Sequence, residues 1–318
     1  MPEVSIIINC LNGERYVRET IESVYAQTFT DWEIVFWDNA STDNTAETAN
    51  SFDEKVRYFR AETTADLGPA RCLAYKQATG DYVAILDADD IWLPEKLERQ
   101  VALFKTNPKL GLVYCDSYMF DGGGDRFRLF QAGQPKRGKV LGDLIAANFI
   151  FTSTMMFSRA KMAEMDYVFD DQFTRAQDYE LTLRVAYHFE VDYVPEALSR
   201  WRMYQDNKQW KDWKASLIPR VVEVKMAIEN LVEAHPDIAT TYPSELQACY
   251  KGLDYNFGIT AWQAGKRSEA RSYLSRYLQD KKYAFVYLCT FVMPFGVFER
   301  LKSFYRNTVT GRMKPKLS

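Results

Sequence analysis

Histidine and cysteine are scarce in this sequence of 318 residues, and their scarcity argues against two kinds of site. The two histidines, His188 and His235, are too few to build a zinc site with scattered cysteines. The cysteines are odd in number, no pair has CxxC spacing, and they lie far apart as Cys10, Cys72, Cys115, Cys249 and Cys289. This pattern is typical of a reducing compartment, not of a disulfide framework. A bound metal would therefore take oxygen ligands, which favours Mg²⁺ or Mn²⁺.

The sequence also lacks a long apolar run and a strong charge of one sign. Its longest strongly apolar stretch, residues 284–298, is too short for a comfortable membrane span and contains Pro294 and Gly296. The first ten residues, MPEVSIIINC, have no basic region and enter a strand at once. We therefore expect no signal peptide and a cytoplasmic protein. The formal net charge of −3 argues against a nucleic-acid partner.

The hydrophobic residues that are present indicate an α/β fold. Short β-branched and aromatic runs, which predict strands, alternate with segments of helical periodicity through about residue 115. The predicted strands are 4–8, 32–37, 56–59, 82–86 and 112–115. This alternation indicates a Rossmann-like, mostly parallel sheet flanked by helices, in which ligands bind at the carboxyl ends of the strands.

The second half of the chain predicts a different organisation. Residues 122–138 are rich in glycine and basic residues, and we expect a flexible excursion over the site. After about residue 210 the pattern is helical throughout. We therefore predict a catalytic domain over residues 1–210 and a helical extension over 211–318.

The stretch AILDADDIW places three carboxylates, Asp87, Asp89 and Asp90, at the end of a buried strand. Two carboxylates about 5 Å apart repel by roughly 3 kcal/mol at an effective dielectric near 20. One interpretation is a divalent-metal site in which the ion also binds a phosphorylated ligand. The other is a polar strand end in which Asp90 caps the next helix. The residues by themselves leave both open.

The stretch FWDNASTDNT raises a similar choice for Asp38, which ends the second predicted strand. Asp38 could accept a hydrogen bond from a nucleobase N–H, or it could form a turn that leads into a helix. Since parallel strands end at the same edge of a sheet, we expect Asp38 and the acids of residues 87–90 to face one crevice.

Taken in order, these segments resemble the family-2 glycosyltransferases, which have the GT-A fold. The matching features are a strand followed by Asn12, a helix with Ile-Glu-Ser-Val and Gln-Thr, and a strand that ends in Asp38 before Ser-Thr-Asp. A later Gly-Asp-Tyr strand leads into Leu-Asp-Ala-Asp-Asp. The resemblance covers about residues 3–205. It implies an enzyme that transfers a sugar from a nucleotide-sugar donor.

The resemblance also implies roles for single residues. Asp38 would contact the nucleobase, Asp87 the ribose region, and Asp89 would bind Mn²⁺ or Mg²⁺ on the diphosphate. The full set implied for nucleotide-sugar contact is Cys10, Asn12, Asp38, Arg71, Asp87, Ala88 and Arg202. Leu11 departs from the aromatic residue common in the family, which weakens any preference for uridine.

An inverting transfer needs a base for the acceptor hydroxyl. The family carries an acidic pair that opens a helix, and RAQDYELTLRVA matches it, with Asp178 as the base and Glu180 as the alternative. Taken alone, Asp178 would be an acid that favours the helix dipole. Ser153 and Thr154 match a family position near the acceptor.

The C-terminal segment alternates aromatic residues with cations and carries no acid after Glu299. Residues 284–316 could form a membrane-surface segment that brings the enzyme to a lipid-linked acceptor, or a core helix with a disordered basic end. The C-terminal helices could also mediate homo-oligomers.

The sequence thus predicts an inverting, metal-dependent transfer, with a UDP-sugar as the expected donor and a hydroxyl of a polysaccharide or glycolipid as acceptor. A nucleotidyltransferase and an inactive sugar-nucleotide-binding subunit on the same fold are the alternatives.

Overall fold

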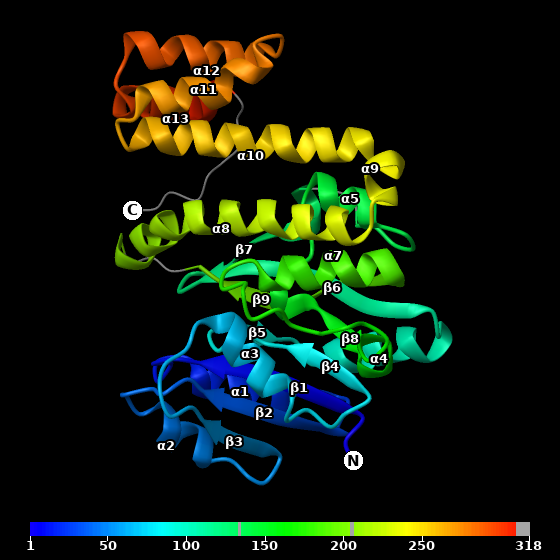
Figure 1. Cartoon of the computed structure of the whole chain (residues 1–318). Helices are drawn as coiled ribbons and strands as arrows, with labels where there is room; N and C mark the ends of the chain where they lie inside the picture. Colours follow the sequence, from blue (N-terminus) through cyan, green and yellow to red (C-terminus); the bar gives the residue numbers. More distant parts are fainter. Residues whose placement is uncertain (133–134, 204–206, 310–318) are drawn as a thin grey trace. The chain divides into compact units, whose positions relative to one another are not determined.

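The computed structural model describes residues 1–132, 135–203 and 207–309 (Figure 1). Contacts within the chain divide it into two units, Met1–Tyr204 and Gln205–Ser318. Each unit is described by itself. The functions expected for these two parts of the chain stay predictions.

The first unit is built on one nine-stranded sheet in the order β3-β2-β1-β4-β8-β6-β9-β5, with β7 paired to β6 (Figure 1). The strands are β1 (Val4–Cys10), β2 (Trp32–Asp38), β3 (Val56–Arg60), β4 (Tyr82–Ile85), β5 (Ile91–Trp92), β6 (Leu110–Asp121), β7 (Gly124–Arg128), β8 (Met156–Ser158) and β9 (Glu190–Arg202). The helices are α1 (Val17–Tyr25), α2 (Thr45–Asn50), α3 (Leu67–Tyr75), α4 (Lys96–Thr106), α5 (Leu141–Ala146), α6 (Arg159–Met162) and α7 (Gln177–His188), and short 3₁₀ turns cover Leu129–Ala132 and Thr152–Thr154.

Strands β1 to β4 form the parallel part of the sheet, as the alternating pattern predicts. β1 pairs in parallel with β2 and β4, and β2 pairs in parallel with β3. Strands buried on both faces read as continuous apolar runs, which is how β1 and β2 read. Because Cys10 is the register partner of Asp38, the two strands end together at one edge. β4 is parallel to β1, so the acidic residues that follow β4 lie at the same edge.

The other half of the sheet differs from the expected run of parallel strands. β8 lies between β4 and β6 and is antiparallel to both. β6 therefore does not extend the parallel run, although it pairs in parallel with β9. Part of the segment expected as a flexible excursion forms β7, which pairs with β6. These pairings join residues far apart in the chain, and a local pattern does not encode them.

Amphipathic helices cover the sheet. α1 buries Val17, Ile21 and Val24 completely, and α4 buries Leu97 and Val101 in the same core. A fully buried Val, Ile or Leu side chain contributes about 1.5–3 kcal/mol to stability. This packing fixes the positions of the helices on the sheet, and with them the positions of the loops at the strand ends.

The second unit is helical, as its sequence predicts. It contains α8 (Asn207–Ala234), α9 (Asp237–Thr241), α10 (Pro243–Gln263), α11 (Arg267–Leu274), a 3₁₀ turn (Ser275–Tyr277), α12 (Lys281–Val292) and α13 (Phe295–Val309). Its core gathers around Trp262, which contacts the rings of Phe295 and Phe298. Among the helices in the described part of the chain, none combines the length and apolar character needed to cross a bilayer.

Candidate active site

The acidic loop after β4 begins with Asp87, which pairs with a buried arginine. Arg71 of α3 is 2% exposed, and its Nη2 donates to Asp87 Oδ1 at 2.7 Å. Burial raises the pKa of Asp87, the Arg71 guanidinium opposes that rise, and the negative charge of Asp178 adds to it. The carboxylate expected as base is therefore close enough to Asp87 to influence its charge. The sequence predicted both residues but could not show that one carboxylate lies within electrostatic range of the other.

Asp89 lies in the same electrostatic field. Burial and the charge of Asp87 raise the pKa of Asp89 to about 6, against the opposing charge of Arg202. A divalent cation would stabilise the ionised forms of both acids. No three His, Cys, Asp or Glu side chains in the described ranges are arranged to enclose a metal among themselves. The residues fit an ion held by one or two carboxylates and substrate phosphates, which is how Mg²⁺ is commonly bound.

Asp90, the third acid of the loop, has a structural position that the sequence did not reveal. Its carboxylate is 1% exposed and accepts from Ser153 Oγ at 2.5 Å and from the backbone N–H of Arg202 at 3.0 Å. Burial raises its pKa well above the ordinary value. Asp90 does not cap the next helix, as one interpretation had it, because α4 begins at Lys96 with Glu95 at the N-cap.

Arg202, at the end of β9, holds the acidic loop after β4 through hydrogen bonds to Asp89 and Asp90. Its Nε donates to the Asp89 carbonyl at 2.7 Å, and its Nη2 pairs with Glu19 at 2.6 Å. The guanidinium also lies over the rings of Tyr16 and Phe120. Arg202 is an ion-paired residue that shapes the acidic loop, and its expected contact with a diphosphate stays a prediction.

Asp38 is enclosed at the end of β2. Its carboxylate is 0% exposed and accepts from Tyr58 Oη at 2.6 Å, Arg60 Nη1 at 2.7 Å and the Ser41 N–H at 2.7 Å. The exposed group at this point is Arg60, whose side chain is 46% accessible. A direct contact between Asp38 and a nucleobase would require Arg60 to move aside.

The loop after β1 holds Cys10 and Asn12 by tight local packing. Cys10 is buried, and burial raises the pKa of its thiol to about 12, so it is not a nucleophile. Asn12 has a φ of 55°, and its Oδ1 accepts from the Thr42 N–H at 2.8 Å. A Cβ on Gly13 would lie 2.3 Å from the Cys10 sulfur, so glycine is required there. The loops after β1 and β2 are thus one rigid edge.

Among the buried polar groups of the described residues, three on α3 or on the strands packed against it have no hydrogen-bond partner. They are the side-chain amide of Asn9, the indole N–H of Trp37 and the Nε of Arg71. Asn9 and Trp37 are register partners and therefore lie on one face of the sheet, and α3 packs against the same strands. Buried polar groups are normally paired, so this arrangement suits a polar ligand. An asparagine at the end of an apolar run was the available sequence signal for Asn9.

Asp178 lies in the first turn of α7, as expected, and is 9% exposed. Thr152 Oγ1 donates to its Oδ2 at 2.8 Å. Glu180, the alternative base, is instead ion-paired with Arg184, which also donates to the backbone carbonyls of Tyr167 and Val168. Glu180 therefore anchors the loop before α7, while Asp178 keeps the more suitable position for chemistry.

Ser153 and Thr154 are almost fully buried, at 4% and 2% exposure. The Ser153 hydroxyl holds Asp90, and the Thr154 hydroxyl donates to the Phe151 carbonyl at 2.6 Å. In this structure the two side chains brace the site from within, so their expected acceptor contact stays a prediction. Thr152 is the member of this turn whose hydroxyl reaches Asp178.

The turn at residues 152–154 is supported from below by a buried lysine that the sequence did not single out. Lys96 is 0% exposed, and its Nζ donates to Gln100 Oε1 at 2.7 Å and lies over the Trp92 ring. Gln100 Nε2 in turn donates to the Thr154 carbonyl at 2.8 Å, and Trp92 Nε1 donates to the Ser153 carbonyl at 2.7 Å. Lys96 therefore orients the groups that hold this turn.

The model of the family described as glycosyl transferase family 2 matches residues 5–165, which include the acidic loop and the turn beside Asp178. The chain belongs to glycosyl transferase family 2. An uncharacterized glycosyltransferase of Methanocaldococcus jannaschii is 28% identical over 208 residues, which cover 64% of this chain and 71% of that protein. The aligned part covers between 31% and 71% of the length of the curated relatives compared.

Two further comparisons carry information on ligands and on fold. The Escherichia coli UDP-Glc:alpha-D-GlcNAc-diphosphoundecaprenol beta-1,3-glucosyltransferase WfgD is 37% identical over 105 residues, which cover 33% of this chain and 42% of that protein. The mannosyltransferase PcManGT from Pyrobaculum calidifontis, solved with GDP-Man and Mn²⁺, has a TM-score of 0.63 at 16% identity. The match covers 98% of this chain and 82% of that one. The glycosyltransferase described here therefore has the GT-A fold.

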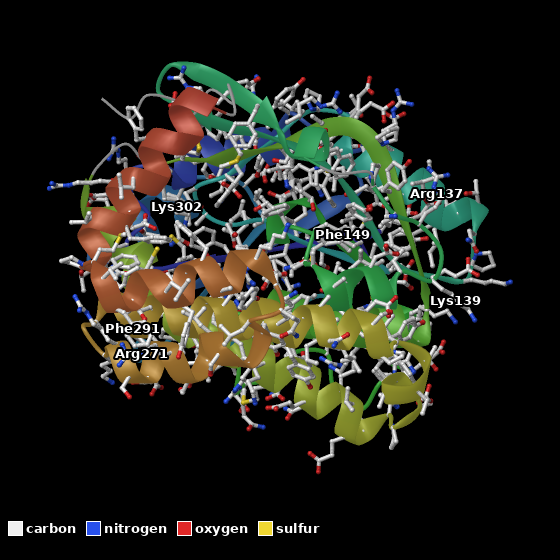
Figure 2. All side chains as sticks on the ribbon, turned by 90° about the horizontal axis from the view of Figure 1, so that it is seen from above. Arg137, Lys139, Phe149, Arg271, Phe291 and Lys302 are labelled. Atoms are coloured by element: carbon white, nitrogen blue, oxygen red, sulfur yellow. The ribbon has the colours of Figure 1, made fainter. Side chains whose placement is uncertain are left out.

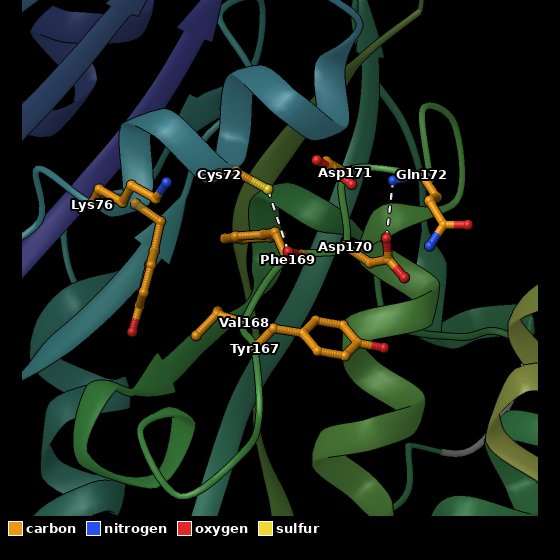
Figure 3. A pocket seen from close by; sticks show the side chains of 9 residues that line it. Cys72, Lys76, Tyr167, Val168, Phe169, Asp170, Asp171 and Gln172 are labelled. Carbon is orange, nitrogen blue, oxygen red and sulfur yellow. Dashed lines mark hydrogen bonds between the residues drawn. The ribbon is translucent and has the colours of Figure 1, made fainter. Parts of the chain in front are cut away.

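The glycosyltransferase also has a cavity of about 570 Å³ outside the acidic loop, between α3 and the segment before α7 (Figure 3). Cys72 lines it, and its Sγ donates to the Phe169 carbonyl at 3.3 Å. Other lining residues are Tyr75, Lys76, Tyr167, Val168, Asp170, Asp171 and Gln172. None of the residues predicted for donor, acceptor or metal contact lines it.

Proposed function

We propose that this chain is an inverting, metal-dependent glycosyltransferase that moves a sugar from a nucleoside diphosphate sugar to a hydroxyl acceptor. The observation that carries the proposal is that one turn contacts both acids at the edge where the donor is expected: Thr152 Oγ1 donates to Asp178 Oδ2 at 2.8 Å, and the Asp87 N–H donates to Ser153 Oγ at 3.2 Å. An acidic group expected to act as base and an acidic loop suited to a phosphate-bound cation then serve one reaction centre.

The roles of the residues follow from their positions. Asp178 accepts the proton of the acceptor hydroxyl, whose oxygen attacks the anomeric carbon as the bond to the diphosphate breaks. The Thr152 hydroxyl donates to one oxygen of Asp178 and the Tyr179 N–H donates to the other, and these two contacts fix the orientation of the carboxylate that receives the proton. Asp89 would hold a Mn²⁺ or Mg²⁺ ion, which would stabilise the charge of the departing diphosphate, and Asp87 would contact the ribose region. Arg71 and the unpaired amide of Asn9 supply donors to the nucleotide.

The nucleobase we propose is uracil. WfgD is named for UDP-Glc, but PcManGT was solved with GDP-Man, so the relatives divide on this point. The pair formed by Asp38 and Arg60 offers both an acceptor and donors to a base. If Arg60 moves aside, Asp38 can accept the N–H of uracil.

The acceptor we propose is a lipid-linked or polysaccharide hydroxyl used in assembly of the cell envelope, and the reaction is placed on the cytoplasmic side. The name of WfgD specifies a diphosphoundecaprenol acceptor, which supports this class of substrate. The chemistry needs only a hydroxyl near Asp178.

A donor screen tests the proposal. Nucleotide-sugars are added with Mn²⁺, and the melting temperature is measured, because a ligand that binds the folded state raises it. Each donor that binds is then assayed for free nucleoside diphosphate. We expect release with a UDP-sugar, loss of release with a chelator and recovery with Mn²⁺.

The same assay separates the alternatives. Release of pyrophosphate in place of nucleoside diphosphate would indicate a nucleotidyltransferase. Binding without release in the presence of varied acceptors would indicate an inactive binding subunit. Equal donor affinity with and without metal would remove the proposed ion.

A further inference from the structure

The outer sides of α12 and α13 carry large apolar side chains that the second unit does not cover. On α12 the exposed fractions are 61% for Phe285, 61% for Leu288 and 77% for Val292. These positions are three and four residues apart and form one stripe on the helix. The opposite stripe, Tyr283, Val286 and Cys289, is buried in the unit's core. α12 is thus apolar on two sides, and only one of them is covered.

α13 repeats this arrangement. Val297, Leu301 and Phe304 are exposed at helical spacing, whereas Phe298 is buried in the core. The rings of Phe285 and Phe298 are 6.5 Å apart, so the two helices are in contact at this point. We call the exposed apolar set the α12–α13 face; it consists of Phe285, Leu288, Phe291, Val292, Val297, Leu301 and Phe304. Such a concentration is unusual on a surface that meets only water.

The same helices carry several cations, and one further cation contacts this face. Lys281 and Lys282 begin α12, Arg300 and Lys302 lie on α13, and Arg271 lies over the Phe291 ring at 4.4 Å (Figure 2). Residues 281–309 contain five Lys and Arg residues and one acid, a net charge of +4, so the rest of the chain carries −7. The positive charge of the chain is therefore concentrated at the end that carries the apolar face.

We propose that the α12–α13 face binds the surface of an anionic lipid bilayer. Apolar side chains flanked by Lys and Arg are the composition of helices that lie in the membrane interface. A second copy of the chain would bring two clusters of like charge together, whereas anionic headgroups would neutralise them. The proposal rests on the proposed function in one respect: a lipid-linked acceptor would be found at that surface.

Both interpretations of the C-terminal segment thus have support in the described residues. The inner stripes are core, and the outer stripes form the proposed membrane surface. Residues 310–316 of the expected segment lie outside the described residues, and the proposal does not depend on them.

Vesicle sedimentation with the full chain tests the proposal. The probes are phosphatidylcholine vesicles with and without phosphatidylglycerol. We expect binding to the phosphatidylglycerol vesicles that weakens as salt is added, and much weaker binding to phosphatidylcholine alone. The double variant Leu288→Ser, Val292→Ser should bind the vesicles on the order of tenfold or more weakly, because it removes two apolar side chains that the bilayer would bury. The variant Arg300→Glu, Lys302→Glu should lose the preference for anionic vesicles.

Val222→Ser on α8 is the matched control, since Val222 is 49% exposed but lies outside the face. It should bind vesicles as the wild type does. No binding by the wild type, equal binding to both vesicle types, or an unchanged double variant would overturn the proposal. Dimers in sedimentation velocity that disappear in the double variant would assign the face to a second copy and overturn it as well.

The readouts of this proposal and of the proposed function are separate. Nucleoside diphosphate release is measured without vesicles, and none of the substituted residues belongs to the active site. Vesicle binding without release would remove only the proposed function, and release without vesicle binding would remove only the membrane surface.

Discussion

Replacing Asp178 by asparagine should separate the chemistry of this enzyme from its stability. The change keeps the shape of the side chain. Asp178 accepts from Thr152 Oγ1 at 2.8 Å and from the Tyr179 N–H at 2.9 Å, and the single amide oxygen of asparagine can replace one of these two acceptors. It removes the negative charge that raises the pKa of Asp87. Because asparagine cannot accept a proton from the acceptor, we expect turnover to fall by roughly 10²–10⁴-fold.

The same change should leave the stability of the folded protein close to that of the wild type, because a hydrogen bond lost from a buried donor opposes the relief of charge repulsion. Like charges that influence each other's pKa repel by about 1–3 kcal/mol at an effective dielectric near 20. Since the Asp87 side chain is 39% exposed, water screens this repulsion, and a gain of ~1 kcal/mol or less remains. The lost hydrogen bond costs a similar amount, so the melting temperature should change by no more than roughly 3 °C in either direction.

Two measurements on the same preparation check this reasoning. Transfer is followed by release of nucleoside diphosphate, and stability is followed by thermal melting without ligand. Donor affinity, measured by calorimetry with Mn²⁺, should be nearly unchanged. Wild-type turnover in the variant would remove Asp178 from the role of base. A change in melting temperature well beyond about 3 °C would show that the relieved repulsion and the lost hydrogen bond do not offset each other.

Three further predictions concern the residues that hold the site. Asp90→Asn should barely change the melting temperature, because burial already favours the neutral carboxyl, whereas Asp90→Ala should cost about 1–3 kcal/mol by leaving the Ser153 hydroxyl and the Arg202 N–H unpaired; equal melting in the two variants contradicts this. Burial lowers the pKa of Lys96 to about 8, so between about pH 8 and 10.5 the unfolded chain binds more protons than the folded chain, and the stability of the wild type should rise with pH in that range. Lys96→Met should remove this contribution. If the melting temperature depends on pH in the same way in the variant and the wild type, the prediction is refuted. Gly68→Ala should lower stability by about 1–3 kcal/mol and also reduce turnover, since its Cβ would lie 1.8 Å from the Phe173 carbonyl oxygen and displace the segment before α7; unchanged melting and turnover would show that the segment adjusts freely.

Individual strands and helices could be predicted from the sequence wherever the residues of one segment were sufficient to indicate them. The apolar runs of β1 and β2 and the helical spacing of Val17, Ile21 and Val24 each depend on neighbouring residues only. The parallel arrangement of the first four strands then placed Asp38 and Asp87 at one edge without any knowledge of side-chain positions.

The hydrogen-bond partners of these acids could not be predicted in the same way. Asp90 looked like a helix cap beside its sequence neighbours, but it holds Ser153 and Arg202, which lie 63 and 112 residues further along. Asp38 looked accessible, but Arg60 and Tyr58 from the next strand enclose it. Such pairings depend on which segments the sheet brings together.

The sequence by itself determined the family, the parallel core of the sheet and the acids at its edge, because residue type and spacing act locally and leave a local record. Only the tertiary structure decided that β8 separates β4 from β6, that Lys96 supports the turn beside Asp178, and that the outer sides of α12 and α13 stay uncovered. The physical reason is that hydrogen bonding and burial depend on distance in space, and residues distant in the chain become neighbours only when it folds.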